Sequence, residues 1–214
     1  MLVGAVVVAA GSGARFGGPK QLCELGGRRV VDLAVDVARA TCDAVVVVVP
    51  PDADWTVPDV VCVPGGATRS ASVRAGLAAL GPAIEIVVVH DAARPLADEA
   101  LFDRVIAAVR DGADGAVPGV TIADTVKQVD ADGRVTGTIP RDALVAVQTP
   151  QAFRAGVLRA AHASAPEGTD DAAVVEGAGG RVVVVAGATD NFKITEPADL
   201  DRAGEVLARR AVVP

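Results

Sequence analysis

Two cationic side chains lie inside a glycine-rich segment near the N-terminus. The segment, residues 9–21, reads AAGSGARFGGPKQ and directly follows a Val-rich apolar run. Glycines allow positive φ angles and bring backbone amides close to a ligand, where they donate hydrogen bonds to phosphate oxygens. Arg15 and Lys20 add full positive charges to the same loop. The segment therefore predicts a loop that binds the phosphates of a nucleotide, with an ordinary flexible connection as the alternative.

Three common motifs do not fit this segment. A dinucleotide-binding fingerprint needs a glycine at position 16, where Phe16 stands, and a helix that begins inside the motif, which residues 17–19 (GGP) prevent. The Gly-Lys-Ser/Thr ending of a P-loop is absent. Ala10 occupies the first glycine position of a G-x-S-x-G nucleophile elbow. These mismatches disfavour a nicotinamide-dependent dehydrogenase.

A second polar segment follows another apolar run. Residues 90–95 read HDAARP and come directly after residues 84–89. A carboxylate at the end of a strand, here Asp91, can hold Mg²⁺ on a triphosphate, because Mg²⁺ prefers one or two carboxylates together with phosphates and waters. The alternative is an ion pair between Asp91 and Arg94 within the loop. We interpret His90 as a hydrogen-bonded structural residue and His162, on a predicted helix, as a surface or packing residue.

Other candidate residues are weaker when each is taken singly. Residues 65–72 (GGATRSAS) join a predicted strand to a predicted helix, and their small side chains suit a flat base or a ribose. Lys193 ends the last predicted strand and would be a third cation at the cleft. Arg141 follows a predicted hairpin, and Thr149 precedes a predicted helix. By itself, each of these is more often structural than functional.

The elements that would position these residues alternate along the chain. Nearly continuous apolar runs, typical of strands buried on both faces, cover residues 2–10, 45–49, 60–63, 84–89 and 181–185. Helical patterns cover residues 30–40, 69–80, 99–110, 151–164 and 196–210. The alternation predicts an α/β fold with a doubly wound, mostly parallel sheet, formed as a single domain over residues 1–214. In such sheets the ligand lies beyond the carboxyl ends of the strands.

One stretch departs from this alternation. Residues 125–129 and 134–139 are short strand-like segments on either side of Asp132-Gly133. An Asp-Gly pair between β-rich runs is a strong hairpin signal. A lone two-stranded hairpin is only marginally stable in water. We therefore predict a β-arm at about residues 122–142 that packs against a partner subunit in a homodimer.

Composition limits the class of protein. The chain has 214 residues, of which 51% are hydrophobic and 22% charged, as expected of a globular protein. Its net charge of −7 argues against a nucleic-acid partner, which normally requires a basic surface. The N-terminal apolar run lacks the preceding basic segment of a signal peptide, and no apolar run approaches the roughly 18 residues of a membrane span. The three cysteines form no C-x-x-C pair, so they fit neither a disulfide framework nor a zinc site. We expect a cytoplasmic enzyme with reduced, buried thiols and no membrane partner.

Taken in order, the polar segments resemble those of a known family. They are residues 9–17 (AAGSGARFG), 19–21 (PKQ), 65–72, 90–95, 124–127 (DTVK), 148–151 (QTPQ), 169–172 (TDDA) and 192–195 (FKIT). From residue 6 to about residue 200 the chain resembles the 2-C-methyl-D-erythritol 4-phosphate cytidylyltransferases. HDAARP together with PKQ is specific to that family and its sugar-alcohol-phosphate relatives. Paired alanines before the first glycine favour the methylerythritol branch over the ribitol-phosphate branch.

The resemblance implies a reaction. The phosphate of methylerythritol phosphate attacks the α-phosphorus of CTP, expels pyrophosphate and gives a CDP-sugar alcohol for isoprenoid synthesis by the non-mevalonate route. Nucleotidyl transfer needs positioning and charge stabilisation more than covalent chemistry from the protein, and the attacking phosphate is already an anion. A missing Ser-His or Cys-His pair is then expected. The implied cofactor is Mg²⁺ or another divalent cation.

The same resemblance implies roles for individual residues. Those implied in charge stabilisation are Arg15, Lys20, Lys193 and Arg141. Those implied in nucleotide binding are Ala9, Ala10, Gly11, Ser12, Gly13, Gly65, Gly66, Arg69 and Ser72. Those implied in binding the sugar-alcohol phosphate are Asp91, Arg94, Thr125, Arg141, Thr149 and Lys193. Asp91 would also face the metal, and Arg141 would act across the dimer interface.

Departures from the family pattern are small, and two alternatives stay open. Ala67 stands where the family commonly has Asp or Asn, which bears on ribose recognition. The nearest alternative is a cytidylyltransferase for ribitol 5-phosphate or another polyol phosphate. A catalytically silent nucleotide-binding regulator belongs to a different class of protein. It would be expected to lose Arg15, Lys20 or Lys193, and all three are present.

Overall fold

A computed structural model describes residues 1–212, and an eight-stranded sheet forms its centre. The strands of this sheet are β1 (Val3–Val8), β4 (Ala44–Val49), β5 (Val61–Pro64), β6 (Ile86–Asp91), β7 (Gly115–Thr121), β10 (Val145–Val147), β11 (Gln151–Arg154) and β12 (Val182–Ala186). They run in the order β10-β7-β11-β6-β1-β4-β5, and β12 pairs with β7. β10 and β11 pair antiparallel with their neighbours, whereas the other pairs are parallel. This mixed, mostly parallel sheet confirms the predicted fold class.

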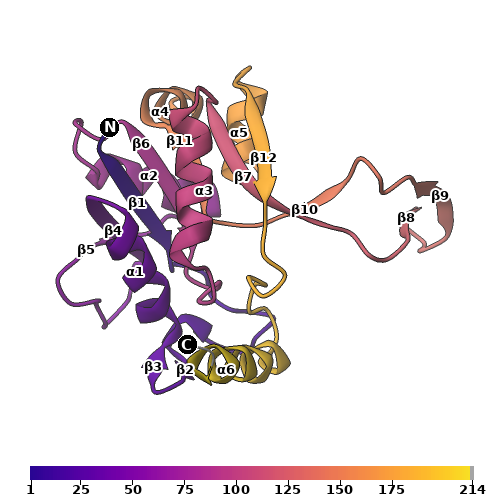
Figure 1. The fold of residues 1–214 in the computed structure, drawn as a ribbon, viewed down its shortest axis with the longest axis horizontal. Coiled ribbons are helices and arrows are strands. Elements are labelled where there is room, and N and C mark those ends of the chain that lie inside the picture. The colour runs from indigo at the N-terminus through magenta and orange to yellow at the C-terminus, as the bar shows by residue number, and fades with distance from the viewer. Residues whose placement is uncertain (213–214) are drawn as a thin grey trace.

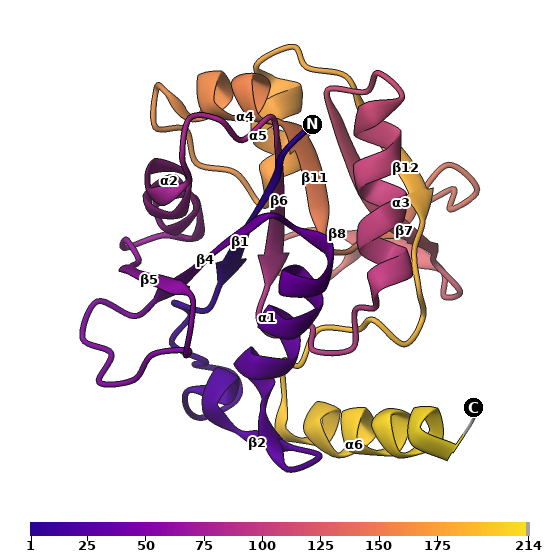
Figure 2. The ribbon, with the colours of Figure 1, turned by 60° about the vertical axis from the view of Figure 1, so that its left-hand side comes forward.

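Helices cover both faces of the sheet. They are α1 (Val30–Thr41), α2 (Arg69–Ala79), α3 (Glu99–Arg110), α4 (Ala155–His162), α5 (Asp171–Gly177) and α6 (Pro197–Val212). Successive side chains of a strand point to opposite faces. In β1, Val7 accordingly packs in the core under α1 and α3, and Val6 packs in the core under α2, α4 and α5. Figure 2 shows α2 and α3 on opposite sides of the central strands, so the sheet is doubly wound.

The C-terminal helix α6 lies at the end of the molecule toward which β1 and β12 run (Figure 1). Shorter elements in the same region are the 3-10 helix η1 (Lys20–Leu22), β2 (Glu24–Leu25) and β3 (Arg28–Arg29). Leu25, Ile194 and Val206 form a separate small core there. This core holds the segment after β12, which contains Lys193, against the segment that follows the glycine-rich loop. No helix among residues 1–212 is long and apolar enough to cross a membrane.

The predicted helix over residues 151–164 is wrong in its first four residues. These residues form β11, which lies between β6 and β7, and helix α4 begins only at Ala155. Ala152 and Phe153 are fully buried on opposite faces of the sheet. A short apolar run buried on both faces has no periodicity that separates a strand from a helix, which explains the error.

Besides the short elements η1, β2 and β3, the sequence prediction lacks β7, β10 and α5. β7 reads GAVPGVT, and its two glycines and its proline lower the strand signal. A Cβ at Gly115 would lie 2.5 Å from Cδ1 of Phe153, and one at Gly119 would lie 2.7 Å from Cγ1 of Val184. The glycines that conceal this strand in the sequence are therefore the residues that make room for large side chains of the neighbouring strands.

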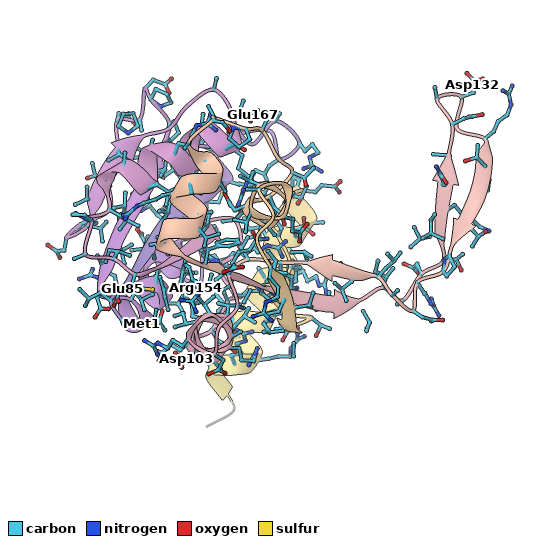
Figure 3. The ribbon with its side chains drawn as sticks, turned by 90° about the horizontal axis from the view of Figure 1, so that it is seen from above. Met1, Glu85, Asp103, Asp132, Arg154 and Glu167 are labelled. Carbon is cyan, nitrogen blue, oxygen red and sulfur yellow. The ribbon has the colours of Figure 1, made fainter. Side chains whose placement is uncertain are left out.

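An arm projects from the body between β7 and β10. Its strands β8 (Val126–Val129) and β9 (Val135–Ile139) pair antiparallel in a sheet of their own. Figures 1 and 3 show the arm extending to one side, with Asp132 at its tip. Asp130 Oδ1 accepts a hydrogen bond from the amide of Asp132 at 3.0 Å, and Gly133 has a φ angle of 79°. The predicted hairpin is confirmed, and its apolar side chains Val129 and Val135 are exposed.

Helix α2 packs closely against the sheet at Gly76. A Cβ there would lie 2.4 Å from Cγ1 of Val6 and 3.0 Å from Cγ2 of Val48. We expect Gly76→Ala to lower the free energy of unfolding by about 1–3 kcal/mol, the usual effect of overpacking a core. The control is Gly156→Ala in α4, where a Cβ meets nothing within 4 Å and stability should hold or rise slightly. Urea unfolding measures both variants, and equal stabilities would contradict the steric explanation.

Candidate active site

A cavity of about 420 Å³ opens at the carboxyl edge of the parallel strands. Its walls come from the segments after β1, β6 and β12 and from the turn between β5 and α2. The lining residues are Val8, Ala9, Ala10, Gly11, Ser12, Gly13, Lys20, Gln21, Gly66, Ala67, Thr68, Arg69, Ser72, Asp91, Ala92, Ala93 and Lys193. Sheets of this class bind their ligands at this edge. The cavity thus lies where the sequence predicts the ligand.

The glycine-rich loop forms one wall. Gly13 has a φ angle of 68°, and its carbonyl oxygen accepts a hydrogen bond from the amide of Gly17 at 2.9 Å. A Cβ at Gly13 would lie 1.8 Å from the carbonyl oxygen of Gly18, so this turn requires glycine. The chain then enters η1, whose first residue, Lys20, lines the cavity. Arg15 lies in the exposed middle of the loop, outside the set of lining residues.

Positive charge accumulates around Lys20. Burial lowers the pKa of Lys20, and the nearby charges of Lys193 and Arg15 lower it further. The carboxylates of Asp91 and Asp199 raise the pKa of Lys20, but by less than burial and the two cations lower it. An ammonium group that burial and other cations destabilise gains most from a bound anion. The electrostatics of the cavity therefore favour a ligand that carries phosphate groups.

Asp91, at the end of β6, lies between two cations of the cavity wall. Its Oδ2 accepts a hydrogen bond from Lys193 Nζ at 2.6 Å, and its Oδ1 lies 3.3 Å from Nε and from Nη2 of Arg69. Burial alone would raise the pKa of Asp91, but Arg69 and Lys193 hold it well below its usual range, so the carboxylate is ionised at neutral pH. The alternative ion pair with Arg94 is wrong. Arg94 Nη1 donates instead to the carbonyl oxygen of Asn191 at 2.7 Å.

His90 is buried and supports the loop after β6. Its Nε2 lies 3.2 Å from the carbonyl oxygen of Arg94, which can only accept, so Nε2 carries the hydrogen and Nδ1 accepts from the Thr149 hydroxyl at 3.2 Å. The Thr149 hydroxyl oxygen also accepts from the amide of Asp91 at 3.0 Å. Burial lowers the pKa of His90 to about 4, which keeps the ring neutral. These contacts confirm His90 as a structural residue and place Thr149 behind the cavity wall.

The turn between β5 and α2 forms another part of the wall. Thr68 caps α2, and its Oγ1 accepts a hydrogen bond from the amide of Ala71 at 3.1 Å. A Cβ at Gly65 would lie 2.5 Å from Cβ of Ala10 and 2.8 Å from Oγ of Ser72. This close approach joins the turn to the end of β1 and leaves a wall of small side chains. Such a wall suits a flat base, as the sequence predicts.

Comparison with known proteins agrees with this geometry. Residues 3–209 match the family described as 2-C-methyl-D-erythritol 4-phosphate cytidylyltransferase. The chain belongs to that family. A relative of that description from Frankia casuarinae is 48% identical over 97% of this chain and 82% of its own length. Another, from Nocardia farcinica, is 47% identical over 98% of this chain and 95% of its own length. The crystal structure of 2-C-methyl-D-erythritol 4-phosphate cytidylyltransferase from Thermus thermophilus is 38% identical, with a TM-score of 0.84 and coverage of 98% and 100%.

The predicted site residues of this family member fall into two groups. Those that line the cavity are Ala9, Ala10, Gly11, Ser12, Gly13, Lys20, Gly66, Arg69, Ser72, Asp91 and Lys193. Those outside the lining set are Arg15, Gly65, Arg94, Thr125, Arg141 and Thr149. Gly65, Arg94 and Thr149 contact lining residues: Gly65 lies against Ala10 and Ser72, the amide of Arg94 donates to the carbonyl oxygen of Asp91 at 2.9 Å, and Thr149 Oγ1 accepts from the amide of Asp91. The structure thus brings together most of the predicted nucleotide set and only part of the predicted sugar-phosphate set.

Thr125 and Arg141 lie at the base of the arm rather than in the cavity wall. Both are exposed, and Arg141 donates a hydrogen bond to the carbonyl oxygen of Ala123. Figure 1 shows the arm directed away from the body that holds the cavity. Any role of these two residues in the site therefore remains a prediction.

The sequence prediction names none of six lining residues (Val8, Gln21, Ala67, Thr68, Ala92 and Ala93) as a site residue, and it does not name Asp171, which lies behind the lining. Gln21 lines the cavity, and Asp171 accepts a hydrogen bond from Arg69 Nη1 at 2.8 Å. Both belong to segments that carry the family resemblance, PKQ and TDDA, yet spacing alone gives them no role. His162 is buried, and its Nε2 lies 3.2 Å from Oδ1 of Asp171. The surface alternative for His162 is therefore wrong, and the packing alternative holds.

Proposed function

We propose that the chain transfers the cytidylyl group of CTP to 2-C-methyl-D-erythritol 4-phosphate. The products are 4-diphosphocytidyl-2-C-methyl-D-erythritol and pyrophosphate, in the non-mevalonate route to isoprenoid precursors. Membership of the family supports this reaction. The observation that carries the proposal is the cavity itself, whose lining combines Lys20, Lys193 and Asp91 with a set of small residues. The lysines suit phosphate groups, and the small-residue wall suits a base.

The residues in the cavity fit charge stabilisation rather than covalent catalysis. The attacking phosphate is already an anion, so no residue needs to remove a proton from it. Lys20 and Lys193 would stabilise the negative charge that redistributes as the bond to pyrophosphate breaks and the new phosphate bond forms. Asp91 holds Lys193 in place at 2.6 Å, which reduces reorganisation during the reaction. We propose that Arg15 adds to the same field, supported by its effect on the pKa of Lys20.

We propose that Mg²⁺ or another divalent cation accompanies CTP. Within residues 1–212 no group of three His, Cys, Asp or Glu side chains could hold a metal ion unaided. Asp91 nevertheless presents an ionised carboxylate to the cavity. One carboxylate combined with triphosphate oxygens and waters is a ligand set that Mg²⁺ accepts. The cation would offset the negative charge of the phosphates, and Asp91 would hold it from the protein side.

The metal proposal predicts that Asp91→Asn will raise the Mg²⁺ concentration needed for half-maximal turnover. An amide keeps the shape of the carboxylate but loses its charge and binds Mg²⁺ more weakly, so added Mg²⁺ should partly restore the rate. Turnover measured against Mg²⁺ at fixed CTP tests this. The control is Asp98→Asn, a carboxylate that caps α3 and lies outside the cavity lining. A loss that is constant at all Mg²⁺ concentrations would limit Asp91 to its contacts with Arg69 and Lys193.

We propose that the chain, as one domain over residues 1–214, forms a homodimer through the arm. Support comes from the exposed apolar side chains Val129 and Val135, on a two-stranded sheet that is only marginally stable when isolated. Thr125 and Arg141, at the base of the arm, would then reach the sugar-alcohol phosphate in the partner's cavity. Such an exchange would supply the part of the substrate site that one chain does not bring together.

We also propose a cytoplasmic location. Cys23, Cys42 and Cys62 are free, and each is only partly buried, which corrects the expectation of buried thiols. Burial raises the pKa of Cys42 to about 11, so that thiol is protonated and unreactive at neutral pH. Unpaired thiols are typical of proteins kept in a reducing compartment.

Pyrophosphate release tests the reaction directly. The protein is incubated with Mg²⁺, with one of CTP, UTP, ATP or GTP, and with either methylerythritol phosphate or ribitol 5-phosphate. We expect release with CTP and methylerythritol phosphate well above every other pair. Faster release with ribitol 5-phosphate would support the polyol-phosphate alternative. CTP binding without release from any pair would support a silent nucleotide-binding protein.

A further inference from the structure

A row of alternating charges leads from the cavity into the interior. It runs from Lys193 through Asp91 and Arg69 to Asp171, and Asp171 in turn contacts His162. The first three residues line the cavity, whereas Asp171 and His162 lie behind it with side chains only 1% and 3% exposed. Buried ion pairs contribute little net stability, because desolvation offsets their attraction. The row therefore matters more for the geometry of the cavity wall than for stability.

Arg69 divides its guanidinium group between two carboxylates. Nη1 donates to Asp171 Oδ2 at 2.8 Å, while Nε and Nη2 lie 3.3 Å from Asp91 Oδ1. The guanidinium is planar and rigid, so the shorter contact with Asp171 fixes the direction of the other N–H groups. Asp171 is itself fixed, because it is the first residue of α5 and His162 Nε2 donates to its Oδ1. Asp171 thus sets how Arg69 meets Asp91.

The consequence of this arrangement reaches Lys193. Arg69 contacts one oxygen of Asp91, Oδ1, which leaves Oδ2 for Lys193 Nζ at 2.6 Å. A guanidinium released from Asp171 would gain most by placing two nitrogens on both oxygens of Asp91, since this bidentate geometry is the favoured one. Arg69 would then compete with Lys193 for Oδ2.

We propose that Asp171 is a positioning residue that keeps Lys193 in its catalytic place. It does so by holding Arg69 through Nη1, so that one oxygen of Asp91 remains available to Lys193. His162 supports Asp171 from the interior. The kinetic consequences rest on the proposed cytidylyl transfer, whereas the geometric consequence does not.

The neighbouring carboxylate Asp170 provides a matched control. It is the N-cap of α5, where its Oδ1 accepts from the amide of Ala173 at 2.9 Å, and its Oδ2 accepts from Gln151 Nε2 at 2.8 Å. Asp170 therefore supports the same helix as Asp171 but makes none of the contacts in the row of charges. Asp170→Asn should lower the melting temperature while leaving kcat within about two-fold, the range typical of a change that touches no reacting group.

We expect Asp171→Asn to lower kcat about 10²-fold, the scale of loss that a misplaced catalytic group produces. The KM for CTP should change far less, because most of the cavity wall is untouched. In the Lys193→Met background the same Asp171→Asn change should lower kcat less than about two-fold, since the group that Asp171 positions is then absent. If Asp171→Asn lowered kcat by the same factor in the Lys193→Met background as in the wild-type background, the proposal would be overturned.

Crystal structures provide a measurement that is independent of turnover. In Asp171→Asn we expect both terminal nitrogens of Arg69 on Asp91, and Lys193 Nζ beyond about 3.5 Å from its Oδ2, outside hydrogen-bond range. An unchanged contact between Lys193 and Asp91 would overturn the proposal even if turnover falls. If Asp171→Asn does not fold, Asp171→Ser replaces it in both measurements, because it removes the carboxylate that holds Arg69 Nη1 and leaves the guanidinium of Arg69 in place. An inactive wild-type protein would refute the proposed function and leave this structural test in place.

Discussion

Replacing Lys20 with Met should lower kcat about 10²–10³-fold, the usual effect of losing one preorganised donor, and should raise the KM for CTP much less. Lys20 is fixed at the start of η1 and lies partly buried in the cavity. Burial and the charges of Lys193 and Arg15 lower its pKa, which means that its charge is poorly solvated before a ligand arrives. Such a charge interacts strongly with the negative charge that develops as pyrophosphate leaves.

The Lys20 prediction separates a transition-state role from a binding role. Steady-state kinetics with CTP and methylerythritol phosphate give kcat and KM for wild type and Lys20→Met. The control is Arg110→Met, which removes an exposed cation at the end of α3, outside the cavity lining. Near-normal kcat with a raised KM would assign Lys20 to ground-state binding of CTP.

The sequence was sufficient for the parts of the fold that have a regular pattern. Val-rich runs buried on both faces, such as β1 and β4, can be read directly, and so can the amphipathic helices α1 and α3. The sequence prediction failed at β7 and at β11. In β7, glycines interrupt the apolar pattern, and β11 is a four-residue strand that passes directly into helix α4. The information there lies in the side chains of neighbouring strands, such as Phe153 against Gly115, and no local pattern in the sequence contains it.

The residues of the candidate site likewise include some that could be predicted from the sequence and some that could not. Residues that follow directly from a strand end, such as Asp91, or that sit in a glycine-rich loop, such as Lys20, are positioned by local geometry and could be predicted. Asp171 could not be predicted, because its partner Arg69 is 102 residues away. The pairing depends on how α2 and α5 pack on one face of the sheet. The alternative of an ion pair between Asp91 and Arg94 failed for the same reason, since Lys193 approaches Asp91 from the far end of the chain.

Mixing Lys20→Ala subunits with Arg141→Ala subunits should restore roughly a quarter of wild-type activity if Arg141 acts in the partner's site. Arg141 is exposed at the base of the arm and lies outside the lining of its own cavity. In a two-fold dimer with exchanged arms, each mixed dimer contains one site in which both residues are intact. Random reassociation makes about half of the dimers mixed, which gives about one intact site in four.

The experiment requires that subunits exchange and that the procedure itself preserves activity. The two variants are mildly unfolded together and refolded, and different affinity tags on the two chains confirm that mixed dimers have formed. Wild-type protein taken through the same steps sets the reference activity. If Arg141 served its own chain, every site in the mixture would lack either Lys20 or Arg141. Activity that stays at the level of the separate variants, in the presence of confirmed mixed dimers, would then place Arg141 outside the partner's site and leave the arm with a role in association alone.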